Sequence, residues 1–305
     1  MAWKPIVVGV DASLVARAAA TFGAGLAARA GARCQLVHAT HEPLAPLPSV
    51  GRDGSRSAIR ERARAQVVAA LGAGAPVHLV QRLAVSWGAP ADVLRHQVAK
   101  LGAGLIILGG KHHSALVRWV GGSTALNVAR TTDVPLLVTT GGTAPLRRVL
   151  VAVDLSQAAR PTLATAQRYA ALFDAELRGL SVIEPLPVIP DVSQPADVES
   201  YYAMSELLLQ REVWPLLGGA RVETVVRRGM AVETIRRETT EWKADLLVVG
   251  SHGKSWAERL LLGSVTEQLL NQLPTALLVV PTRGAQEVAV DEARAAEGSP
   301  VVAIA

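Results

Sequence analysis

The chain has 305 residues, of which 50% are hydrophobic, 19% charged and 4% aromatic, and its net charge is +5. This length suits two domains of about 150 residues, and the apolar fraction excludes a mainly disordered protein. The single cysteine, Cys34, excludes an intramolecular disulfide framework and a cysteine-based zinc cluster, which is typical of the reducing cytoplasm.

The first segment, residues 1–5, leads directly into an apolar run. It lacks the basic start, hydrophobic stretch and cleavage site of a secretory signal. No uncharged apolar stretch reaches the ~18 residues that a membrane helix needs. The sequence therefore predicts a cytoplasmic protein with no membrane partner.

The sequence contains an internal repeat: a similar succession of residues occurs twice along the chain. Three segments return in the same order: 6–11 as 149–154, 105–109 as 246–250, and 122–123 as 263–264. The offset drifts only from 143 to 141 residues, which chance resemblance between apolar runs would not maintain. A Gly/Pro-rich stretch, residues 141–145, separates the copies. We therefore predict domains at 1–142 and 146–283, followed by a flexible tail at 284–305.

Within each copy, short Val/Ile/Leu-rich runs alternate with longer segments of helical spacing, such as 14–31, 57–71 and 198–217. This alternation predicts parallel strands joined by right-handed helical crossovers. The expected fold is α/β: two tandem open-sheet sandwich domains, each with about five parallel strands flanked by helices. Ligands of such sheets bind at the carboxyl ends of the strands.

The most informative strand end is the fourth of the second copy, where glycines follow the spacing G-x2-G-x9-G-S. The four residues are Gly250, Gly253, Gly263 and Ser264. Glycines let backbone amides approach phosphate oxygens, and the helix expected after Gly263 has free N–H groups at its start. The pattern predicts an anion cradle; the alternative is that each glycine merely serves a turn.

Two other phosphate motifs fail. Gly253-Lys254-Ser255 imitates the end of a Walker A loop, but Val248 stands where the upstream glycine is required. No G-x-G-x-x-G follows a first strand, which argues against a dinucleotide Rossmann site.

At these residues the sequence resembles the universal stress protein family in its tandem two-domain form. The resemblance rests on the motifs V-G-V-D-A-S and V-A-V-D-L-S on the first strands, V-I-E on the second, and V-V-G-S-H-G-K-S with L-L-G-S-V-T after the fourth. The resemblance implies ATP as ligand, since the last motif binds ATP in a subset of the family, and Mg²⁺ would arrive with the phosphates. It also implies that domains pair through their last strands, here 136–140 and 276–281.

Carried over by position, the resemblance implies a role for each motif residue. Asp154 would contact the adenosine and Val182 the adenine edge, with Val249 and Val265 as walls of the pocket. The phosphates would be held by Gly250, Gly253, Gly263 and Ser264.

The first copy departs from this pattern. It keeps four weaker candidates: Asp11, Gly109, Gly122 and Ser123. However, His112 stands in the place of Gly253, and Thr40 in the place we assign to Val182. A side chain where backbone must approach phosphate disturbs such a loop. We expect one competent and one degenerate site.

No catalytic residue and no metal site is predicted. His112 and His113 are adjacent and cannot converge as an i, i+4 pair, and no nucleophile elbow occurs.

Residues 1–145 carry a net charge of +9 and residues 146–305 a net charge of −4. The arginines between residues 52 and 64 are either a solvated helix face or a docking surface for an acidic partner. They lack the interleaved aromatic residues of a nucleic-acid site.

The sequence thus predicts an ATP-binding stress-response regulator, with nucleotide held mainly in the C-terminal domain. A homo-oligomer and a regulatory protein partner are expected. Two alternatives stay open: an ATPase of low turnover, and an interaction module that binds no nucleotide.

Overall fold

The computed structural model describes residues 2–40, 52–110, 124–141, 145–185, 195–218, 221–253 and 262–282. The predicted tail, 284–305, lies outside these residues. Among the described residues, no helix combines the length and the apolar character needed to span a bilayer.

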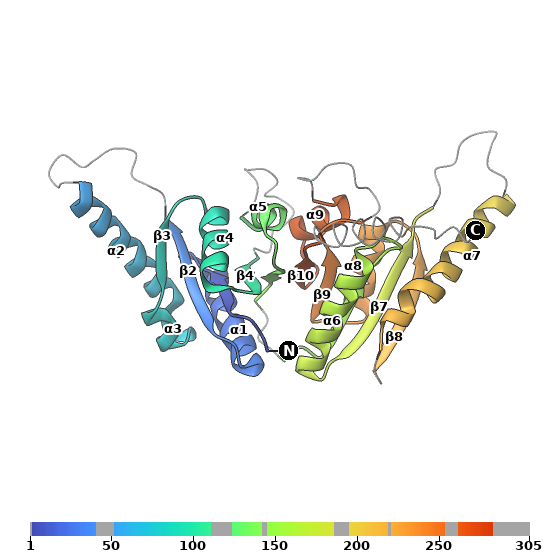
Figure 1. Ribbon diagram of the computed structural model, residues 1–305, viewed down its shortest axis with the longest axis horizontal. Coiled ribbons are helices and arrows are strands. Elements are labelled where there is room, and N and C mark those ends of the chain that lie inside the picture. Colours follow the sequence, from blue (N-terminus) through green and yellow to red (C-terminus); the bar gives the residue numbers. More distant parts are fainter. Residues whose placement is uncertain are drawn as a thin grey trace, which may run out of the picture.

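One ten-stranded sheet runs through the molecule, in the order β3-β2-β1-β4-β5-β10-β9-β6-β7-β8 (Figure 1). The first copy supplies β1 (Ile6–Gly9), β2 (Cys34–Thr40), β3 (Ala84–Trp87), β4 (Leu105–Gly109) and β5 (Leu136–Thr139). The second copy supplies β6 (Arg148–Ala152), β7 (Glu176–Ile183), β8 (Val222–Arg228), β9 (Leu246–Gly250) and β10 (Ala276–Val280). Within each copy all five strands are parallel, and the predicted fold class is confirmed.

The two copies join where their last strands meet. β5 and β10 pair antiparallel, with Leu137 opposite Leu278 at the centre of the register. Both side chains are fully buried, because each strand is apolar on both faces and is covered by helices on both. The expected pairing of the last strands is therefore present within the chain.

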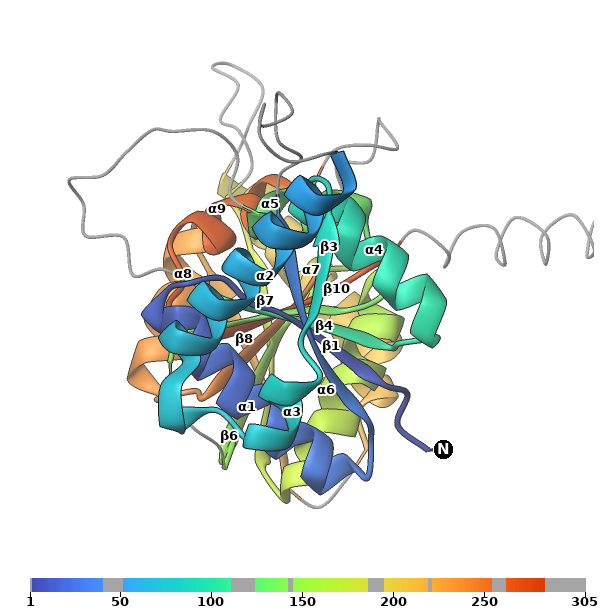
Figure 2. The same cartoon turned by 90° about the vertical axis from the view of Figure 1, so that its left-hand side faces the viewer.

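Helices cover both faces of the sheet. One face carries α1 (Leu14–Ala30), α2 (Arg52–Leu71), a 3₁₀ turn (Gly72–Gly74), α3 (Val77–Gln81), α6 (Ala159–Phe173), α7 (Pro195–Leu208), a π-helical turn (Leu209–Val213) and a second 3₁₀ turn (Trp214–Leu216). The other face carries α4 (Pro90–Leu101), α5 (Thr124–Thr131), α8 (Ala231–Glu241) and α9 (Ser264–Asn271). From the end that carries α2, the strands fan across one another, because the sheet twists (Figure 2).

The ends of these helices follow local sequence rules. α1 stops before Gly31, which adopts the left-handed conformation (φ 62°) that a glycine takes without a steric penalty. α4 begins at Pro90, as its sequence predicts. The segment expected at 198–217 is less regular, since α7 passes into the π-helical turn at Leu209.

Side chains also connect the two copies on both faces. Trp3 packs edge-on against Tyr169 of α6 with ring centroids 5.2 Å apart, and the Arg168 guanidinium lies 3.9 Å over the Trp3 ring. On the opposite face, Arg130 of α5 forms a 3.0 Å ion pair with Glu267 of α9. The copies are therefore held together by more than the β5–β10 ladder.

Candidate functional site

The carboxyl ends of three adjacent strands bring the predicted residues of the second copy together. β9, β6 and β7 are neighbours in the sheet. Gly250 ends β9, Asp154 follows β6, and Val182 lies next to the last residue of β7. This edge is where open parallel sheets bind ligands.

Asp154 and Gly253 lie against each other. The Oδ1 atom of Asp154 accepts a hydrogen bond from the backbone N–H of Ser156 at 3.0 Å. A Cβ atom at Gly253 would lie 2.6 Å from Oδ2 of Asp154. No real Cβ atom makes so short a contact, so the bare backbone of Gly253 lies against the carboxylate. Any other residue at this position would have to displace the Asp154 carboxylate.

Ser251 holds the two ends of the glycine motif together. It is 2% exposed, and its backbone N–H donates to the Val280 carbonyl at 2.8 Å. Its carbonyl accepts a 2.9 Å hydrogen bond from the Gly263 N–H. Its hydroxyl accepts from the Thr282 N–H at 3.1 Å and lies 2.9 Å from Nδ1 of His252. The segments 251–253 and 262–264 are consequently adjacent, although residues 254–261 lie outside the described part of the chain.

Helix α9 begins at this junction. Gly263 is its N-cap residue, Ser264 is exposed, and Val265 is half-buried. The buried Thr266 donates from its hydroxyl to the Gly250 carbonyl at 2.7 Å, which ties the helix to the end of β9. Because the first N–H groups of a helix have no acceptor within it, the start of α9 can bind an anion there.

The glycines of the cradle have little room for side chains. A Cβ atom at Gly250 would lie 3.2 Å from the His252 carbonyl, and one at Gly263 would lie 3.3 Å from the Ser251 carbonyl. Both contacts are to backbone atoms, which cannot turn aside. A side chain at either position would therefore require the backbone to shift.

The two valines predicted at the adenine end differ in burial. Val182 is half-buried and packs with the apolar cluster on the α8 and α9 face. Val249 is 4% exposed and belongs to the same cluster. Of the two valines, Val182 therefore has the greater solvent-exposed surface at the end of its strand.

The first copy repeats part of this geometry. Oδ1 of Asp11 accepts hydrogen bonds from the Ser13 N–H at 3.1 Å and from the Ser13 hydroxyl. However, a Cβ atom at Gly109 would lie 2.5 Å from the Val15 carbonyl oxygen, so the start of α1 closes on this glycine. His112, Gly122 and Ser123 lie outside the described residues.

The structure corrects one correspondence between the copies. The Thr40 carbonyl accepts a 3.0 Å bond from the glycine after β3, and the Ile183 carbonyl accepts a 3.1 Å bond from the glycine after β8. These bonds are equivalent, so Thr40 corresponds to Ile183. Ala39 stands in the place of Val182, and both pack in the same apolar cluster. Assigning Thr40 to that place was wrong by one residue.

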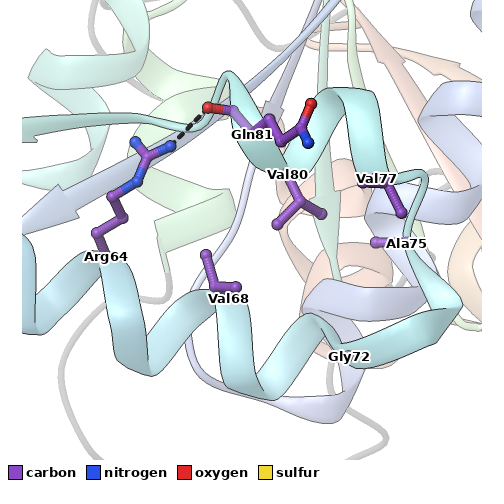
Figure 3. A pocket seen from close by; sticks show the side chains of 7 residues that line it. All are labelled: Arg64, Val68, Gly72, Ala75, Val77, Val80 and Gln81. Carbon is purple, nitrogen blue, oxygen red and sulfur yellow. Dashed lines mark hydrogen bonds between the residues drawn. The ribbon is translucent and has the colours of Figure 1, made fainter.

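A separate hollow of about 500 Å³ lies between α2 and α3 (Figure 3). Val68, Val77 and Val80 give it an apolar lining. Arg64 at its edge donates to the carbonyls of Gln81 and Leu83, each at 2.6 Å. Its guanidinium is thus committed to backbone carbonyls, and the hollow contains none of the predicted site residues.

Metal-ligating side chains are not grouped at the site. Across the described ranges, no cluster of three His, Cys, Asp or Glu side chains is placed to hold an ion. Asp154 contributes a single carboxylate at its strand end.

Comparison with known proteins gives a consistent family likeness. The universal stress protein family model matches residues 2–140 and again 145–281. A universal stress protein of Mycobacterium tuberculosis is 27% identical over 291 residues, which cover 90% of this chain and 96% of that protein. The crystal structure of a universal stress protein from Archaeoglobus fulgidus has the same fold, with a TM-score of 0.63 and 19% identity over 92% of this chain and 98% of that one. A universal stress protein solved in complex with cAMP is 28% identical over 45% of this chain and 98% of its own, with a TM-score of 0.34.

Proposed function

The chain belongs to the universal stress protein family, with two tandem family domains, and from that premise we propose that it binds ATP in its second domain as a stress-response regulator. The observation that carries the proposal is the 2.9 Å hydrogen bond from the Gly263 N–H to the Ser251 carbonyl. It keeps both halves of the glycine motif beside Asp154, so that one set of backbone amides can face a triphosphate.

Each residue has a distinct part in this proposal. Asp154 accepts a hydrogen bond from the adenosine, and Val182 lies along the adenine edge. The bare backbone at Gly250, Gly253 and Gly263 and the start of α9 at Ser264 hold the phosphates. Val265 covers the pocket from α9, and Val249 supports it from the core. Mg²⁺ comes with the nucleotide through phosphate oxygens.

The first domain differs in two supporting ways. Val15 closes on Gly109 through its carbonyl, and Ala39 supplies a smaller side chain than Val182 at the strand edge. We propose that this domain does not hold nucleotide at comparable affinity and that the protein binds one equivalent of ATP.

Regulation would depend on different conformations of the second domain. Nucleotide shifts the population of conformations only by binding one more tightly than another, and a protein partner then reads the favoured state. The proposed compartment is the cytoplasm, in keeping with a single cysteine. A homodimer is also proposed, and because β5 and β10 are already paired with each other, it forms through another surface.

The test measures what the purified full-length chain binds. Mass spectrometry of the small molecules released on denaturation should detect an adenine nucleotide, and isothermal titration with ATP should give one equivalent. Two equal equivalents would contradict the asymmetry between domains. Absence of any nucleotide and of any heat of binding would favour the interaction module, and steady phosphate release from bound ATP would favour the slow ATPase.

A further inference from the structure

Arg130 and Glu267 form a charge pair that crosses from the first copy to the second. The Nη2 atom of Arg130 lies 3.0 Å from Oε1 of Glu267, although the residues are 137 positions apart. The side chains are 33% and 37% exposed. Nε of Arg130 is buried and, within the described part of the chain, has no hydrogen-bond partner. The pair is therefore partly withdrawn from water. Charges in such a partly buried position are screened less than charges at the surface.

Glu267 lies where its charge affects the proposed phosphate site. It is the acidic residue of the first turn of α9, and its backbone N–H donates to the Gly263 carbonyl at 2.9 Å. A carboxylate in the first turn stabilises a helix, but the same charge repels an anion bound at that end. Arg130 supplies the neutralising charge for this carboxylate.

The equivalent positions of the two copies do not form a second pair of this kind. With the offset of 141 residues, Leu126 corresponds to Glu267 and Asn271 corresponds to Arg130. The first copy thus supplies an arginine to α9 and receives no equivalent charge at α5. This asymmetry matches the asymmetry of the glycine motifs.

We propose that Arg130 is a positioning and specificity residue for the second domain: by neutralising Glu267 it allows that domain to bind a triphosphate. The inference rests on the proposed function. Arg130 acts through Glu267 and is not required to touch the nucleotide. The first domain then serves the nucleotide site of the second domain without holding nucleotide itself.

The charge of Glu267 should affect nucleotides with different numbers of phosphates to different extents. Without Arg130, the negative charge of Glu267 acts on the ligand, and a triphosphate carries more negative charge than a monophosphate. Removing Arg130 should therefore weaken ATP more than AMP. The difference should shrink as salt is raised, because mobile ions screen the repulsion between the Glu267 carboxylate and the phosphates.

The test is a double-mutant cycle on the full chain, with binding of ATP and of AMP measured by isothermal titration at low and high salt. We expect Arg130→Ala to weaken ATP about fivefold and AMP by less than about twofold. Glu267→Gln should leave ATP affinity unchanged or higher, and Arg130→Ala with Glu267→Gln should restore it. Arg130→Lys, which retains the charge, should bind nearly as wild type.

A matched control is Arg95→Ala, which removes an exposed 2.9 Å pair with Asp92 on α4 and should change neither affinity. If Arg130→Ala binds ATP as wild type does, or if the double variant is as weak as Arg130→Ala, the inference is wrong while the proposed function stands. If the wild-type chain binds neither nucleotide, the proposed function fails, and the inference fails with it. Should Arg130→Ala not fold, Arg130→Gln takes its place, because it removes the charge and keeps most of the side chain's length; it should weaken ATP more than AMP, and equal binding to wild type would overturn the inference.

Discussion

Gly253 lies directly against Asp154, so closely that a Cβ atom on the glycine would be 2.6 Å from the carboxylate oxygen Oδ2. The neighbour is the far end of a side chain and not backbone, so it can move aside. The protein would tolerate such a Cβ atom, but only by displacing the one carboxylate that the proposed adenosine contact requires.

Gly253→Ala should therefore reduce nucleotide affinity by tenfold or more while changing stability little. The expected loss comes from the displaced carboxylate together with the blocked approach of the loop backbone to phosphate. Isothermal titration with ATP measures the first effect, and urea unfolding measures the second.

The control for this variant is Gly25→Ala in α1, where a Cβ atom would meet nothing within 4 Å. It should raise stability by up to about 1 kcal/mol, as alanine does in a helix, and leave ATP binding unchanged. Equal affinities for wild type and Gly253→Ala would remove the main support for the glycine cradle.

The fold was predictable because its signals are local and repeated. Many of the strands are apolar runs between helical segments, and the duplication repeats two of these runs, 6–11 and 105–109, in the second copy. The β5–β10 pairing was expected from the resemblance to the universal stress protein family, and the apolar character of both last strands agrees with it. The π-helical turn at Leu209 carries no comparable signal, and the regular helix predicted for that segment was too simple.

The sequence indicated which residue types form the candidate site, but not how those residues are arranged in space. The spacing of Gly250, Gly253 and Gly263 indicated a cradle, whereas the bond from Gly263 to Ser251 depends on how the chain returns to β9. Thr40 was misassigned because two neighbouring small residues at the end of β2 differ little in pattern, and only the bond from the following glycine fixes the register.

Long-range charge pairs gave no sequence signal at all. Arg130 and Glu267 are far apart in the chain, and neither belongs to a motif. Their meeting follows from the pairing of β5 with β10, which brings α5 and α9 together on one face of the sheet. Only the assembled sheet makes such a pair visible.

Thr266→Val should loosen the proposed phosphate helix. The substitution keeps the shape of the side chain but removes the 2.7 Å hydrogen bond to the Gly250 carbonyl. We expect a loss of about 1–2 kcal/mol in the free energy of unfolding and a several-fold weaker ATP affinity. Thr240→Val is the control: Thr240 is exposed and its hydroxyl donates to the Arg236 carbonyl within α8, so neither quantity should change appreciably. A change in stability without a change in affinity would show that the position of α9 does not matter for binding.

Cys34 should be nearly inert in the folded protein. Cys34 is half-buried, and this burial raises the pKa of its thiol to about 12, so that the thiol is almost entirely protonated at pH 8. Labelling with a disulfide reagent should be slow in buffer and rapid in urea, with one equivalent consumed. Since the unfolded thiol ionises near pH 8.5, ionisation favours the unfolded chain, and stability should fall as pH rises above about 9. Fast labelling of the folded chain would contradict this burial.

Glu238→Gln should destabilise the second domain strongly. Glu238 is 3% exposed, and its two carboxylate oxygens bind Arg178 at 2.6 Å and Arg227 at 3.1 Å, which ties α8 to β7 and β8. Glutamine has nearly the same size, but it leaves the half-buried Arg178 with its pair to Glu223 alone. The amide NH2 group of glutamine would also face the N–H donors of the two arginines. The expected loss is about 3 kcal/mol in the free energy of unfolding by urea. The control is Asp92→Asn, which removes an exposed pair on α4 and should cost less than about 0.5 kcal/mol. Similar losses for the two variants would mean that the buried position of Glu238 gives its ion pairs no additional weight.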